Sequence, residues 1–149
     1  DCTPLFFYDP VRKVCALSHG GWRGTAGDIA GKTVSLMVER FHSRREDILG
    51  AIGPAIGLMD FEVGKEVIDD MRLLFSGEEW PSLFREKGNG KYLFSLAEAN
   101  HCLMRKAGLL EEHIEDCHIS TWTHNDFFYS YRKEKGRTGR HMAVLMMEP

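Results

Sequence analysis

Two short apolar runs at the start of the chain are separated by a turn signal. The runs cover residues 5–8 and 14–17, and Asp9-Pro10 begins the segment between them. Asp followed by Pro is typical of turns. The pattern therefore predicts a β-hairpin, with its turn centred between Pro10 and Val11.

Three later stretches place apolar residues at helical spacing. They cover residues 30–41, 63–75 and 96–107. Thr25 is the predicted cap of the first helix. The third opens with the capping box Ser95-Leu96-Ala97-Glu98 and ends at Gly108, which suits a left-handed C-terminal cap.

Short β-type runs alternate with these helices, and further strands are predicted near the C-terminus. The predicted strands cover residues 48–53, 92–94 and 115–120, and a final hairpin is expected from 127–132 and 142–147. Residues 77–90 are predicted to form a loop. Helices and strands alternate in the middle while hairpins lie at both ends, which predicts a mixed α/β layered domain.

Composition limits the function classes. A chain of 149 residues suits one domain, residues 1–149. The formal net charge of −3 gives no basic field for nucleic acid, and no apolar run approaches the roughly 18 residues that span a bilayer. Four cysteines without a C-x-x-C pair favour free thiols in a reducing cytoplasm. The sequence predicts a cytoplasmic protein with neither nucleic acid nor membrane as a partner.

Cys2 and His19 are the first candidate site. With the turn centred as above, Cys2 lies opposite His19, on the same face of the hairpin and with Cβ atoms about 4.5–5.5 Å apart. A thiolate and an imidazole at that separation can share one zinc or copper ion. A slip of one residue would put them on opposite faces. The alternative is a strand end with a buried cysteine and a surface histidine.

The segment from His19 to Thr25 is rich in glycine and contains Arg23. Glycines let a backbone approach a ligand closely, and a following helix N-terminus favours anions. Arg23 adds a bidentate donor for a phosphate. The alternative is a tight connection between strand and helix, with Trp22 packed in the core.

Two further segments could contribute to a pocket. Residues 50–57 include four glycine or proline positions, so their backbone could line a site, although a buried strand ending in a turn also explains them. The aromatic residues of 127–131 could stack on a purine, and Arg132 could reach an anion. A core strand followed by a solvated basic loop is the alternative there.

Several motifs, in order along the whole chain, resemble the YfiH/YlmD family, also called the laccase-domain or multicopper polyphenol oxidase family. The matching segments are Asp1-Cys2-Thr3-Pro4, His19-Gly20-Gly21-Trp22-Arg23-Gly24, Gly53-Pro54-Ala55-Ile56-Gly57, Phe61-Glu62-Val63-Gly64, Tyr129-Ser130-Tyr131-Arg132 and Thr138-Gly139-Arg140. Gly20, Ser120 and Lys133 depart from the family pattern, which leaves the two metal-ligand matches intact.

The resemblance implies a layered α-β-β-α sandwich with a mixed sheet. It also implies a metal, Zn²⁺ or alternatively Cu²⁺, bound by a His, a Cys and a His. Cys2 and His19 match two of these ligands. The third belongs to a segment upstream of Asp1, so we expect this chain to lack its N-terminal part.

The activity implied is that of a metal-dependent enzyme with purine nucleoside and phosphate as small-molecule partners. Family members are associated with phosphorolysis of adenosine, inosine and methylthioadenosine and with adenosine deamination. Cys2, His19 and Arg23 would be catalytic, and Arg23 and Arg132 would bind substrate. The alternatives are a copper-dependent polyphenol oxidase and a non-catalytic or cell-wall quality-control module.

Overall fold

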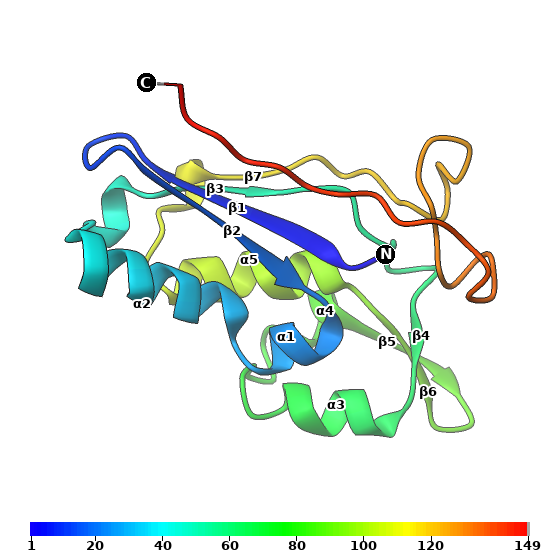
Figure 1. Ribbon diagram of the computed structural model, residues 1–149. Coiled ribbons are helices and arrows are strands. Elements are labelled where there is room, and N and C mark those ends of the chain that lie inside the picture. Colours follow the sequence, from blue (N-terminus) through cyan, green and yellow to red (C-terminus); the bar gives the residue numbers. More distant parts are fainter. Residues whose placement is uncertain (149) are drawn as a thin grey trace.

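The protein contains a four-stranded sheet that packs against helices on one face, in a computed structural model that describes residues 1–148 (Figure 1). The strand order is β2-β1-β3-β7. β1 pairs antiparallel with both β2 and β3, whereas β7 runs parallel to β3. The bounds are Thr3–Asp9 for β1, Val14–Gly20 for β2, Leu49–Ile52 for β3 and Ile114–Asp116 for β7.

The predicted N-terminal hairpin is confirmed, but its predicted register is wrong by two residues. Pro4, not Cys2, is the partner of His19. The cause is a longer turn: the carboxylate of Asp9 accepts hydrogen bonds from the backbone N–H groups of Val11 (2.8 Å) and Arg12 (2.9 Å), an arrangement typical of Asp in turns. A shift of two residues preserves the face on which each side chain lies.

Helices cover one face of this sheet. α2 (Ile29–Phe41) and α5 (Leu96–Lys106) lie side by side against it, and the short α1 (Trp22–Ala26) follows β2 directly (Figure 1). Alternate residues of β1 point into the core between these layers, so Leu5 and Phe7 are fully buried while Tyr8 is exposed.

The N-terminal cap of α5 agrees with the sequence prediction, and that of α2 differs from it. Ser95 caps α5 by accepting from the backbone N–H of Glu98, as predicted. Thr25 does not cap α2; that role belongs to Asp28, whose side chain accepts from the N–H of Gly31. Thr25 is instead fully buried and hydrogen-bonded to Asn100 of α5.

A second, three-stranded sheet lies beyond the helices, with strand order β4-β6-β5. The predicted loop at 77–90 is wrong, because residues 80–83 form a short helix and residues 84–88 form a strand. Phe84, the first residue of that strand, stacks on Phe94 of the neighbouring strand with 4.6 Å between ring centroids. The bounds are Glu62–Val63 for β4, Lys65–Met71 for α3, Trp80–Leu83 for α4, Phe84–Gly88 for β5 and Lys91–Phe94 for β6, with 3₁₀ turns at Arg45–Asp47 and Glu111–His113.

The predicted C-terminal hairpin is also wrong. Residues 127–132 consist of turns and irregular chain, and residues 142–147 form no strand. Burial alternates along the latter, since Ala143 and Leu145 are half-buried between exposed neighbours, so the two-residue period is present. Within residues 1–148, however, the segment 142–147 pairs with no strand and so forms no hydrogen-bonded ladder. The segment instead crosses beside the sheet as an extended chain (Figure 1).

The mixed α/β class predicted from the sequence is confirmed by the two sheets and the helices that separate them. In the described part of the chain, no helix is both long enough and apolar enough to cross a bilayer.

Gly108 gives a testable consequence of this fold. Its φ of +102° favours glycine, and a Cβ there would lie 2.9 Å from Cδ of Arg45. Gly108→Ala should lower the free energy of unfolding by about 1 kcal/mol or more, measured by urea denaturation. Gly77→Ala is the matched control, because nothing lies within 4 Å of a Cβ at that position. Equal midpoints for the two variants would contradict this interpretation.

Candidate active site

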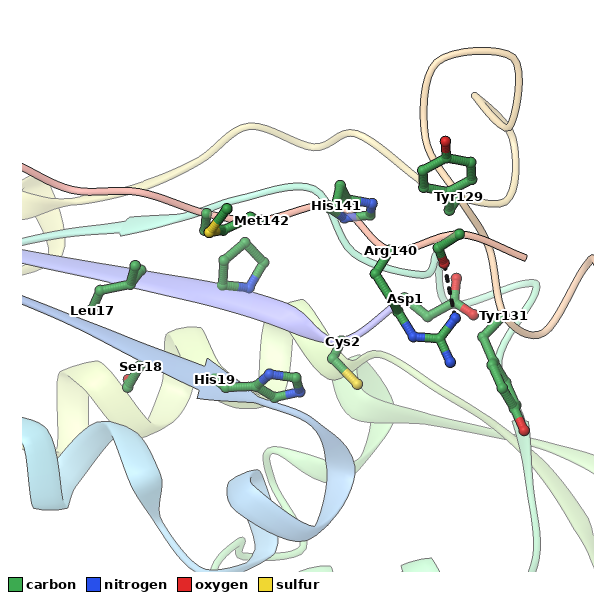
Figure 2. A pocket seen from close by; sticks show the side chains of 13 residues that line it. Asp1, Cys2, Leu17, Ser18, His19, Tyr129, Tyr131, Arg140, His141 and Met142 are labelled. Atoms are coloured by element: carbon green, nitrogen blue, oxygen red, sulfur yellow. Dashed lines mark hydrogen bonds between the residues drawn. The ribbon is translucent and has the colours of Figure 1, made fainter. Parts of the chain in front are cut away.

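A cavity of about 570 Å³ lies between the start of the hairpin and the C-terminal segment (Figure 2). Cys2, Pro4 and His19 line it from the hairpin side. Tyr129, Tyr131 and residues 139–143 line the other side. The cavity therefore brings together residues more than one hundred positions apart in the sequence.

Cys2 and His19 converge in this cavity, as their shared sheet face predicts (Figure 2). Sγ of Cys2 and Nε2 of His19 lie 3.1 and 3.3 Å from the point that a Cβ of residue 21 would occupy. Residue 21 is a glycine, so both donor atoms border space that no side chain fills. This is an arrangement in which a thiolate and an imidazole fit a shared metal ion.

Two ligands do not complete a metal site. Within residues 1–148, no group of three His, Cys, Asp or Glu side chains is arranged to hold a metal. A third ligand outside these residues stays a prediction.

Asp1, which directly precedes β1, is hydrogen-bonded to three segments that lie far from it in the sequence. Its carboxylate accepts hydrogen bonds from the hydroxyls of Thr121 and Ser130, each 2.8 Å, and from the N–H of Arg132 at 2.7 Å. Its backbone carbonyl accepts from the N–H of Ile56 at 2.9 Å. Thr121 and Ser130 are fully buried, so the bonds to Asp1 are shielded from water.

Glu134 holds the loop that forms the tyrosine side of the cavity. Its Oε1 accepts from the Thr138 hydroxyl, the Asn125 amide and the N–H of Ser130. These hydrogen bonds, that of Thr138 first, hold the pKa of Glu134 below its usual value. The carboxylate is therefore ionised at neutral pH and keeps the loop closed on itself.

The sequence did not predict that Arg140 and His141 contribute to the cavity. Both line the cavity, and Figure 2 shows their side chains beside Asp1 and above Cys2. The His141 ring lies edge-on to Phe128, with 5.8 Å between centroids, and its partial removal from water lowers its pKa. The segment Thr138-Gly139-Arg140 matches a family motif, but no periodic pattern in the sequence indicates that it folds back beside Cys2.

Two arginines singled out in the sequence lie elsewhere. Arg23 is exposed on α1, with its guanidinium 4.3 Å from the centre of the Trp22 ring. Arg132 donates to the backbone carbonyl of Glu62 at 2.6 Å and lies over Phe61. Neither belongs to the residues that line the cavity.

The glycine-rich segment after β3 borders a different, smaller cavity of about 220 Å³. Ala55 forms an isolated parallel bridge with Ser120, and this part of the chain supports Asp1 through Ile56. Residues 53–57 therefore help to position Asp1, and they do not line the cavity of Cys2 and His19.

The fold and the cavity define a mixed α/β domain with a thiol and an imidazole directed into one pocket. A family model described as multi-copper polyphenol oxidoreductase laccase matches residues 1–148. The chain belongs to this family, and the YfiH/YlmD resemblance is thereby confirmed.

Curated relatives and solved structures agree with this membership. The chain is 39% identical, over 97% of its length, to a purine nucleoside phosphorylase, YlmD, of Geobacillus stearothermophilus, and 34% identical over 99% to a purine nucleoside phosphorylase of Bacteroides thetaiotaomicron. The crystal structure of a Bacillus licheniformis hypothetical protein, YfiH, superposes with a TM-score of 0.89 at 38% identity over 93% of this chain, and that of Geobacillus stearothermophilus YlmD with 0.88 at 40%.

The chain spans about half the length of these relatives: 53% of the first and 54% of the second. It likewise covers 52% of the Bacillus licheniformis chain.

Gly21 allows a direct test of the donor pair. Its φ of −73° and ψ of 166° are open to any residue, so Gly21→Ala should fold normally. The added Cβ would enter the space between Sγ and Nε2 and displace both donors. We expect zinc affinity to fall about tenfold or more, measured by competition with a chromogenic chelator on the complete natural protein that contains these residues. Unchanged affinity would show that the two donors do not share a metal.

Proposed function

We propose that this chain forms the thiol–imidazole part of a metal-dependent purine nucleoside phosphorylase that also deaminates adenosine. Its substrates would be adenosine, inosine and methylthioadenosine, together with phosphate. The observation that carries the proposal is the convergence of Cys2 and His19 in a cavity walled by two tyrosines. The relatives named purine nucleoside phosphorylases support the same reaction.

Cys2 and His19 would hold the metal, which we propose to be Zn²⁺. When bound, zinc supplies a Lewis acid that polarises a reacting group or activates water. Cu²⁺ is the alternative, because the family description refers to copper. The protein itself would supply the imidazole from β2 and the thiol from the residue just before β1, and the pairing of Thr3 with Gly20 holds these two parts of the chain together.

The tyrosines provide a surface for the purine. Tyr129 and Tyr131 lie on the cavity side opposite Cys2, and both are partly exposed. An aromatic ring can stack on a purine while its hydroxyl remains in water. Stacking would hold the glycosidic bond in the space between the tyrosines and the hairpin, where orientation alone can accelerate the reaction.

A copper-dependent oxidation of phenols is the second candidate, favoured by the description of the matching family. The two reactions are separated by assaying one sample for release of hypoxanthine from inosine and phosphate, and for oxygen uptake with a phenol. A cell-wall module without catalysis would show neither reaction. Release of hypoxanthine without oxygen uptake is the outcome that we expect.

The proposed metal ligands give the first prediction on activity. In the complete natural protein that contains residues 1–149, Cys2→Ala and His19→Ala should each abolish phosphorolysis and deamination, since each removes a direct metal ligand. Metal content, measured by mass spectrometry, should fall with activity. Cys117→Ala and His124→Ala are matched controls, because both side chains are exposed and line no part of the cavity. Full activity in either ligand variant would refute the metal assignment.

The proposed substrate roles of Arg23 and Arg132 can be tested in the same way. Arg23 is exposed and lies over Trp22, outside the cavity. We therefore expect its charge to contribute to phosphate binding only by long-range electrostatic attraction. Arg23→Ala should raise the KM for phosphate about threefold to tenfold, or roughly 0.7–1.4 kcal/mol, and should leave deamination unchanged. Arg132→Ala should raise the KM for nucleoside, because it removes the hydrogen bond to Glu62 that helps to hold the segment of Tyr129 and Tyr131 in place. An equal loss of both activities in the Arg23 variant would mean that Arg23 serves the structure of the site, not phosphate.

A further inference from the structure

Arg140 is the arginine whose side chain lines the cavity shared by Cys2 and His19 (Figure 2). Arg23 and Arg132 do not line it. The position of Arg140 therefore raises the question of which ligand its charge serves.

Most of the guanidinium is free to bind a ligand. Nη1 donates to two carbonyls of its own loop, those of Thr138 (3.2 Å) and Gly139 (2.8 Å). Among residues 1–148, Nε and Nη2 have no protein acceptor, and no carboxylate lies within ion-pair distance of Arg140. The nearby carboxylate of Asp1 is already occupied by three donors.

The surrounding loop fixes where this charge lies. Thr138 is bonded to Glu134 at 2.6 Å. A Cβ on Gly139 would lie 2.6 Å from the Tyr129 ring, so only glycine permits this close packing. The guanidinium itself lies over Tyr131, 5.3 Å from the ring centre. The charge is thus oriented before a ligand arrives, which reduces the entropy lost on binding.

We propose that Arg140 binds the phosphate co-substrate inside the cavity. This assignment rests on the proposed phosphorylase function and adds the residue that contacts phosphate directly. A guanidinium presents parallel N–H groups that match the oxygens of an oxyanion. A neutral purine or ribose would leave that charge without a counter-ion.

In the reaction that this arrangement serves, an oxygen of dihydrogen phosphate forms a bond to C1′ of the nucleoside. The bond between C1′ and the purine nitrogen breaks, and its electron pair leaves with the base. The proton lost from phosphate ends on that base, so the products are ribose 1-phosphate and the free purine. Arg140 would orient the phosphate and balance its charge, and no oxidant or reductant is required.

The test compares three variants of the complete natural protein: Arg140→Gln, Arg140→Lys and the control Arg137→Gln. Arg137 belongs to the same loop and is exposed, but it lines no part of the cavity. Arg140→Gln should raise the KM for phosphate about 100-fold, change the KM for inosine less than threefold and leave adenosine deamination intact. Arg140→Lys should fall between, because it keeps the charge and loses the paired donors. Arg137→Gln should match the wild type.

Binding of inorganic phosphate, measured by calorimetry without nucleoside, separates this proposal from the proposed function. Phosphate binding that Arg140→Gln removes supports the assignment, even if no hypoxanthine is released; in that case the proposed function fails alone. Phosphate binding that is equal in Arg140→Gln and the wild type, or absent in both, overturns the assignment. Equal loss of deamination and phosphorolysis, with the thermal midpoint unchanged, also overturns it, because Arg140 would then serve both reactions.

Discussion

The carboxylate of Asp1 connects the parts of this protein that have the least secondary structure. Thr121, Ser130 and Arg132 belong to segments without helix or strand, and all three donate to it. Cys2 follows Asp1 directly in the chain. Any movement of the tyrosine wall relative to the thiol would stretch these hydrogen bonds, so the width of the cavity depends on one side chain. A carboxyl group suits this task, because its two oxygens can accept several hydrogen bonds at once.

The side of the cavity formed by Tyr129 and Tyr131 is also held by a carboxylate, that of Glu134. Glu134 gathers donors from both ends of its loop and thereby replaces the ladder that a hairpin would have supplied. Two carboxylates therefore organise the C-terminal region through side-chain contacts, while the N-terminal wall is held by backbone pairing between β1 and β2. The cavity thus combines one side, next to Cys2 and His19, that is held by backbone pairing with a second side whose shape depends on hydrogen bonds to carboxylates.

Part of this arrangement could be predicted from the sequence. The face shared by Cys2 and His19 follows from alternation alone, and it survives an error of two residues in the register. The cap at Ser95 and the positive φ of Gly108 depend on neighbours in the chain, so local pattern was sufficient there. Residues 127–132 and 142–147 have a strand-like pattern, yet the path of the chain from Asn125 to Thr138 follows hydrogen bonds to Asp1 and Glu134. Such contacts leave no periodic signal, which is why Arg140 and His141 were not expected in the cavity.

The position of β2 affects how the chain behaves on its own in solution. Within residues 1–148 β2 pairs only with β1, so its outer side presents unpaired N–H and C=O groups along a strand of seven residues. Leu17 is partly exposed on the same strand. An open strand edge with an apolar side chain can recruit the edge of another molecule. During expression or refolding at high concentration, the same hairpin that carries His19 is therefore the place where we expect aggregation to begin.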